Sequence, residues 1–99
     1  MSIDMSIRQK AALERLIRIA QRDTGQSRMT AEFLLSWWNA ATCGGFDLAT
    51  LWGLDSEIAA DVVTVFGLVA SCHRYPDELG YGEEFRRIVH AWRPALKHG

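Results

Sequence analysis

The sequence predicts an all-α protein, a compact bundle of four main helices plus one short helix, and three observations carry this prediction. Apolar residues recur at the three- and four-residue spacings of an amphipathic helix in the long segments. No segment alternates apolar and polar residues as a half-buried strand does. The chain of 99 residues is 48% hydrophobic and has only 2 prolines, a composition typical of a folded domain. We therefore expect a single helical domain over residues 1–99, with residues 1–5 disordered.

The first predicted helix begins after Ser6, because Ser6 and Gln9 have the spacing of a capping box. Its apolar face consists of Leu13, Leu16, Ile17 and Ala20, and residues 23–26 (DTGQ) are expected to end it. A second helix is predicted from about Arg28 to Ala41, and the glycine pair that follows Cys43 is expected to end it. Apolar side chains cover most of this second helix, so it must be covered on more than one side.

A short helix is predicted next, with Asp47 as its cap and Trp52 near its end. Asp55 is expected to cap a third main helix that runs to about Cys72. The main face of this helix is expected to contain Ile58, Val62, Val65, Phe66 and Val69. Another side carries only small residues, Ala60, Thr64, Gly67 and Ser71, which would let a neighbouring helix approach closely. Intramolecular packing is the favoured interpretation of that small side.

The last main helix follows a turn-rich connection over residues 74–82. Phe85, Ile88, Val89 and Trp92 lie on one face of it, and Pro94 stops it. The most apolar run of the chain, residues 58–72, contains Asp61 and is too short and too polar to span a bilayer. The chain opens without the apolar run of a signal peptide, and its two cysteines are expected to be reduced thiols. We expect a cytoplasmic protein with no membrane contact.

Charge is segregated along the chain although the formal net charge is only −1. Residues 1–31 hold six basic and three acidic residues, residues 32–85 hold nine acidic residues and a single arginine, and residues 86–99 hold four basic residues. The near-neutral total gives no general argument for nucleic-acid binding. The local blocks instead predict two candidate binding surfaces, one basic and one acidic.

The basic candidate is a stripe on the first helix formed by Arg8, Arg15, Arg18 and Arg22, which fall within a narrow arc opposite the apolar face. It would suit an anionic partner, although an ordinary solvated face has the same pattern. A helix-turn-helix reader is disfavoured, because the next helix carries large apolar residues where base-reading polar ones are needed. The acidic candidate could imitate nucleic-acid phosphate and consists of Asp55, Glu57, Asp61, Asp77, Glu78, Glu83 and Glu84.

Trp37 and Trp38 are adjacent on the second helix, so their indoles diverge by about 100° and cannot share one narrow core-facing stripe. Either that helix is packed on two sides, or one indole lies in an interface, where tryptophan is enriched. Homodimerisation is a simple way to cover so apolar a helix, and we expect a homodimer.

No catalytic, metal-binding or cofactor-binding motif is predicted. Cys43 and Cys72 lack the spacing of a dithiol or zinc site and are expected to be small buried fillers. The histidines lack the i, i+4 spacing that puts two metal ligands on one helical face. We therefore expect no enzymatic activity and no cofactor.

The segments ALERLIRIAQRDTGQS, WWNA, CGGFDL, LWG, GYGEEF and AWRP resemble a family of short, uncharacterised bacterial proteins, over roughly Ala11 to Leu96. The resemblance implies a setting in plasmids, integrative elements and prophages of proteobacteria, and it assigns no chemistry to any residue. Small proteins of such elements often bind host complexes, as anti-CRISPR inhibitors do.

Three functional hypotheses follow. The first is a non-enzymatic, dimeric interaction protein that binds and inhibits a host macromolecular complex such as a CRISPR effector. The second is a small nucleic-acid-associated or regulatory protein that uses the basic stripe. The third is an accessory subunit of an element-encoded machine, with the apolar second helix as its docking surface.

Overall fold

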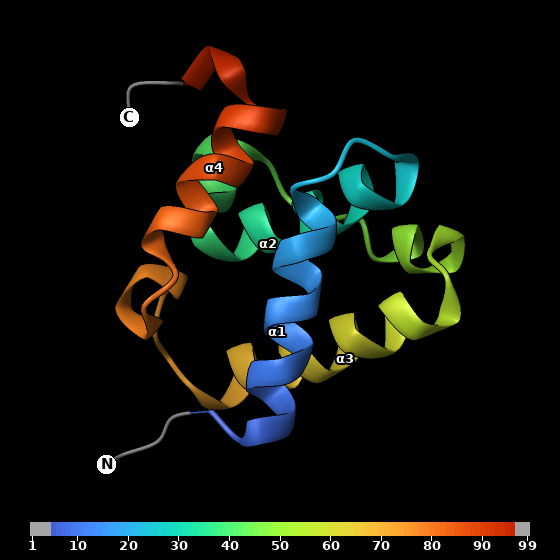
Figure 1. The fold of residues 1–99 in the computed structure, drawn as a ribbon, viewed down its shortest axis with the longest axis vertical. Coiled ribbons are helices and arrows are strands. Elements are labelled where there is room, and N and C mark those ends of the chain that lie inside the picture. The colour runs from blue at the N-terminus through green and yellow to red at the C-terminus, as the bar shows by residue number, and fades with distance from the viewer. Residues whose placement is uncertain (1–4, 97–99) are drawn as a thin grey trace.

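The computed structural model describes residues 5–96, and these form four α-helices and three short 3₁₀ segments (Figure 1). The α-helices are α1 (Ile7–Ala20), α2 (Gly25–Cys43), α3 (Ser56–Ser71) and α4 (Gly82–Trp92). The 3₁₀ segments are η1 (Leu48–Gly53), η2 (Pro76–Leu79) and η3 (Pro94–Leu96). No strand occurs among the described residues. The predicted fold class, four main helices plus a short one, is confirmed, and the predicted short helix is η1.

Helix α1 is the central element of the fold. It contacts α2, α3 and α4, and α4 packs in turn on α2 (Figure 1). The predicted apolar face of α1 is confirmed, since Leu13, Leu16 and Ala20 have no exposed surface. At its C-terminal end, the indole Nε1 of Trp92 donates a hydrogen bond to the carbonyl oxygen of Ala20 (2.7 Å), which fixes α4 to α1.

The ends of α1 and α2 follow from their capping residues. The capping box of α1 is confirmed: Gln9 N donates to Ser6 Oγ (3.0 Å) and Ser6 N donates to Gln9 Oε1 (3.1 Å). The predicted start of α2 at Arg28 is wrong by three residues, because Thr24 is the N-cap and its Oγ1 accepts from Ser27 N (3.0 Å). The polar residues that suggested a loop therefore form the first turn of α2.

Helix α3 differs most from expectation. Its buried residues are Val62, Val65 and Leu68, whereas Phe66, which was predicted to be in the core, is exposed. The side of small residues is also turned outward, with Ala60, Gly67 and Ser71 exposed and Thr64 half-buried, so their intramolecular packing is not observed. The cause is that α3 packs mainly on α1 and leaves its opposite side uncovered.

The predicted disorder of residues 1–5 falls largely outside the described residues, since the structure begins at Met5. Met5 itself is half-buried and packs against the core. Within the described part of the chain, no helix is long and apolar enough to cross a membrane.

Candidate functional site

An apolar groove of about 410 Å³ lies between α2, α3 and the segment that joins them. Helix α2 contributes Phe33 to its wall, and the joining segment contributes Phe46, Leu48 and Leu51. Helix α3 contributes its outward residues, among them Val63 and Phe66. The groove therefore opens beside a face of α3 that the other described residues leave exposed.

Local backbone geometry builds the wall of this groove. Helix α2 is kinked at Asn39 (φ −162°, ψ 81°), and it ends at Gly44, whose φ of +103° is readily adopted by glycine. The chain then turns back, and the ring of Phe46 meets the ring of Phe33 edge-on, with centroids 5.4 Å apart. The predicted cap of η1 is confirmed, because Ala49 N donates to Asp47 Oδ1 (3.0 Å).

The other end of the wall is held by Gln26 of α2. Its Nε2 donates to the carbonyl oxygen of Gly53 (2.8 Å), and its Oε1 accepts from the backbone N–H of Asp55 (2.8 Å). Asp55 occupies the predicted N-cap position of α3, but its side chain makes no capping hydrogen bond there. The C-terminal end of the joining segment is thus anchored to α2 by two hydrogen bonds with the Gln26 side chain.

Large apolar side chains stand exposed around the groove. The exposed fractions are 57% for Phe66, 61% for Val63 and 65% for Leu48, while Trp52 of η1 is 88% exposed. With about 200 Å² for a whole aromatic side chain, Phe66 alone presents roughly 110 Å² of apolar surface at the groove, and Val63 and Leu48 add to it. Exposed apolar side chains gathered at a groove are typical of an interaction site. We call the groove and its exposed residues Leu48, Val63 and Phe66 the α3 groove surface.

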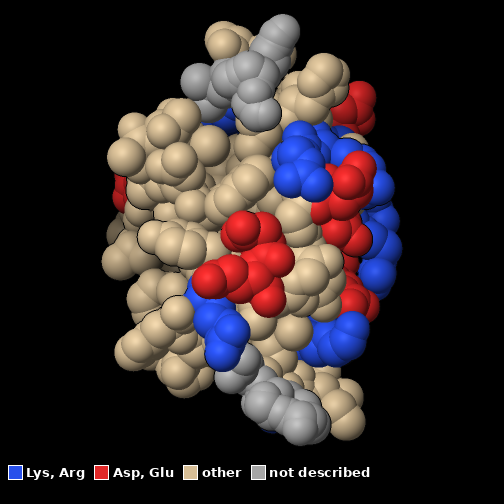
Figure 2. Space-filling model, turned by 90° about the vertical axis from the view of Figure 1, so that its left-hand side faces the viewer, with Lys and Arg blue, Asp and Glu red and all other residues tan. Residues whose placement is uncertain are grey.

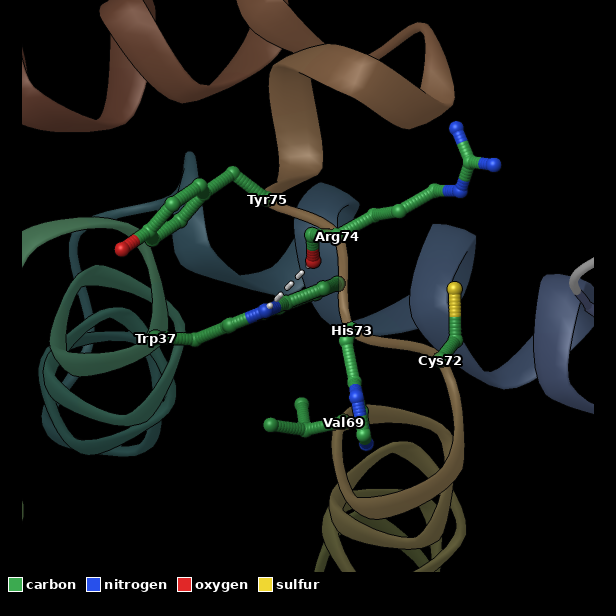
Figure 3. A pocket seen from close by; sticks show the side chains of 6 residues that line it. All are labelled: Trp37, Val69, Cys72, His73, Arg74 and Tyr75. Carbon is green, nitrogen blue, oxygen red and sulfur yellow. Dashed lines mark hydrogen bonds between the residues drawn. The ribbon is translucent and has the colours of Figure 1, made fainter.

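The adjacent tryptophans of α2 pack against α4. Trp37 and Trp38 both contact the fully buried ring of Phe85 edge-on, with centroids 6.0 and 5.6 Å apart. Trp37 also donates from Nε1 to the carbonyl oxygen of Arg74 (3.3 Å), as Figure 3 shows. Both indoles are half-buried, so the two-sided packing of α2 accounts for their adjacency. Their participation in an interface stays a prediction.

A second, smaller pocket of about 280 Å³ lies where Trp37 meets the segment after α3 (Figure 3). Cys72 and His73 both line it, but their side chains point in different directions, so they do not form a nucleophile–base pair. Both Cys43 and Cys72 are buried free thiols, as predicted. Burial raises the pKa of the Cys43 thiol, although Arg93 opposes the shift. Among residues 5–96 no three His, Cys, Asp or Glu side chains gather as metal ligands would.

The predicted basic stripe lies on the exposed side of α1, but it is not a purely cationic surface. Arg15 forms a two-bond ion pair with Asp61 of α3, from Nε to Oδ2 (2.8 Å) and from Nη2 to Oδ1 (2.9 Å). These hydrogen bonds raise the pKa of Arg15. The remaining members, Arg8, Arg18 and Arg22, are exposed. Figure 2 shows acidic and basic side chains interleaved along one edge of the molecule.

Glu14 contributes further negative charge to α1. It accepts from Lys10 Nζ (2.7 Å) and from the hydroxyl of Tyr81 (2.8 Å). Both hydrogen bonds lower the pKa of Glu14, with the larger effect from Lys10. Burial and the bond to Glu14 raise the pKa of Tyr81. The carboxylate of Glu14 therefore stays ionised beside the arginines.

The predicted acidic set is not one surface. Asp55 and Glu57 lie at the start of α3, whereas Asp77, Glu78, Glu83 and Glu84 follow its far end, and a helix of 16 residues is about 24 Å long. Asp61 is bound to Arg15, Glu83 Oε1 accepts from Arg86 (3.3 Å), and Glu78 accepts from the backbone of Tyr75 (2.8 Å). Figure 2 shows one small acidic cluster near the middle of the face, with basic side chains beside it and a band of mixed charge along one edge.

Comparison with known proteins identifies a family for this chain. Residues 10–93 match the family of unknown function DUF7673. The chain belongs to this family. The expectation of an uncharacterised family is thereby confirmed. No curated protein and no solved structure matches the DUF7673 protein significantly.

The site that sequence reasoning missed is the α3 groove surface of this DUF7673 protein. The sequence pattern places Phe66 in the core, and it does not single out Val63. One available signal was that α3 carries apolar or small residues almost all round, with Glu57 and Asp61 as its only charged residues. A helix with so little polar surface needs a second covering element.

Proposed function

We propose that this DUF7673 protein acts without catalysis, by docking another protein chain on its α3 groove surface. The observation that carries the proposal is the groove of about 410 Å³ whose rim presents Leu48, Val63 and Phe66 to solvent. Exposed apolar residues around a preformed groove are typical of helix-in-groove recognition, in which a partner inserts apolar anchors. Hydrophobic and aromatic anchors at such sites contribute most of the binding free energy.

The partner class that we propose is a host macromolecular complex in the cytoplasm, with inhibition as the outcome and a CRISPR effector as one example. The support for this target is the resemblance to short proteins of proteobacterial mobile elements. Because the groove is apolar, the target is expected to insert an apolar segment into it. The target surface around that segment need not be basic. The phosphate-mimicry mechanism loses its main support, because the acidic residues lie in separate groups.

Nucleic-acid binding through the basic stripe is the weaker alternative. One of its four arginines is already paired with Asp61, and Glu14 adds a carboxylate to the same helix. A role as an accessory subunit is compatible with the groove, but its docking surface would be α3 and not α2, which α1 and α4 cover.

The test compares tagged wild-type protein with two variants in quantitative affinity purification from host lysate. Phe66→Asp places a charge on the groove rim, while Ile7→Asp makes the same change at an exposed residue of α1 that does not line the groove. We expect a stoichiometric protein partner with the wild type and Ile7→Asp, and at least about tenfold less of it with Phe66→Asp. Retention of that partner by Phe66→Asp would show that the groove is not the docking surface.

A third variant examines the alternative. Arg18→Glu combined with Arg22→Glu reverses two exposed arginines of the basic stripe and leaves the groove intact. The groove account predicts that this variant keeps the protein partner. Loss of binding here, together with retention by Phe66→Asp, would favour the basic stripe instead. Circular dichroism and thermal unfolding of all variants establish that each is folded.

A further inference from the structure

We propose that a second copy of this chain occupies the α3 groove surface of the free protein, through antiparallel pairing of two α3 helices. The phenyl ring of Phe66 from each copy enters the groove of the other. This inference rests on the proposed function, because it uses the same docking surface. The second copy covers the groove in the free protein, and a target replaces it in the complex.

The α3 groove surface is complementary to itself. A two-fold dimer brings the same patch of both copies together, so that patch must contain both a projecting group and a cavity. Phe66 projects from α3 at the rim, and the groove beside it has a volume of about 410 Å³. The edge-on pair of Phe33 and Phe46 lines that groove and offers aromatic contacts to an entering ring.

The exposed face of α3 has a shape that suits packing against another helix. Ala60, Val63, Gly67 and Ala70 are all exposed and recur at spacings of three and four residues, which places them on one side of the helix. A methyl group added at Gly67 would meet no atom within 4 Å. Small residues along this side let a second helix pack closely, at the short end of the usual interaxial range of about 8–10 Å.

The charge distribution of α3 favours an antiparallel orientation. The charged residues of α3, Glu57 and Asp61, lie in its N-terminal half, and of these Asp61 is already paired with Arg15. An antiparallel pair places the acidic N-terminal turn of one α3 beside the C-terminal end of the other and aligns the helix dipoles favourably. A parallel pair would place Glu57 beside its own copy. The centre of the pair, around Val63 and Gly67, carries no charge.

A dimer of moderate affinity needs an interface of moderate size. A standard interface buries about 800 Å² on each partner, and weaker ones bury less. The surface of this chain is 5888 Å², so an interface of that size would cover roughly a seventh of it. Phe66, Val63 and Leu48 supply apolar area to this interface, and the small outward residues of α3 supply more.

The experiment is sedimentation analysis of the full chain from about 1 µM to about 1 mM, a range that covers weak and moderate dimers. Phe66→Asp removes the projecting ring. Gly67→Gln adds a long uncharged side chain in open space, so it blocks close helix approach while leaving the α3 of each copy intact. Ile7→Asp is the matched control. We expect dimers for wild type and Ile7→Asp, and at least a tenfold weaker dimer for Phe66→Asp and Gly67→Gln.

A wild-type protein that stays monomeric over the whole range overturns the inference. So does a dimer that both Phe66→Asp and Gly67→Gln leave unchanged, since another surface then pairs the copies. The proposed function fails separately: a monomeric wild type that loses its lysate partner on Phe66→Asp would leave the docking groove in place and remove only the second copy from it.

Discussion

The packing of Phe85 allows a quantitative test of how α2 holds α4. Phe85 is fully buried, and its ring contacts Trp37 and Trp38 edge-on. Phe85→Leu keeps an apolar side chain but removes both aromatic pairs, each worth about 0.5–1.5 kcal/mol beyond buried area. We therefore expect a loss of about 2 kcal/mol in the free energy of unfolding. Phe85→Ala also opens a cavity, so its expected loss is about 4 kcal/mol.

Urea denaturation followed by circular dichroism measures both losses. Phe46→Leu is the matched control, because the half-buried Phe46 has a single aromatic contact, to Phe33. Its expected loss is about 1 kcal/mol. A typical domain of this size is stable by about 5–15 kcal/mol, so Phe85→Ala removes a large fraction of the total. If Phe85→Leu costs no more than Phe46→Leu, the two indoles do not clamp α4 as described.

Three further predictions concern single positions. Gly67→Ala should raise the free energy of unfolding of the monomer by about 0.5–1 kcal/mol, because Gly67 is mid-helix with open space around it. Urea denaturation at low protein concentration measures this gain, and a loss would contradict that environment. Trp52→Phe should remove most of the acrylamide-quenchable tryptophan fluorescence of a monomeric sample, because the Trp52 indole is far more exposed than the other tryptophans. Unchanged quenching would show that Trp52 is not exposed. In a Cys72→Ala variant, Cys43 should react with a thiol reagent at pH 8 far more slowly in the folded protein than in the unfolded protein. The reason is that burial hinders access to the Cys43 thiol and raises its pKa. Equal rates would place Cys43 at the surface.

Local signals predicted the helices of this fold well. The capping box of Ser6 and Gln9, the cap at Asp47 and the glycine end of α2 depend on residues a few positions apart. Such contacts can be recognised from sequence spacing alone. The start of α2 was missed because Thr24 resembles a loop residue until Ser27 is seen to be buried against the core.

The outward face of α3 could not be predicted, because periodicity does not distinguish two apolar faces of one helix. Val65 and Phe66 are adjacent and similarly apolar, yet Val65 is buried and Phe66 is exposed. Which face is buried depends on where α1 lies, and this is a tertiary fact. The charged candidate surfaces could not be judged from the sequence for the same reason. The ion pair of Arg15 with Asp61 joins positions 46 residues apart, and it takes one member from the basic stripe and one from the acidic set.

The central claim is that the α3 groove surface docks a protein chain, and site-specific photo-cross-linking tests it most directly. A benzophenone amino acid at position 66 stands at the rim of the groove, and the same amino acid at position 7 stands on α1 as the control. The account predicts discrete protein adducts from position 66 in host lysate, mapped either to Phe46 and Leu48 of a second copy or to a target, and few from position 7. Equal yields at the two positions, or none at position 66, would contradict it.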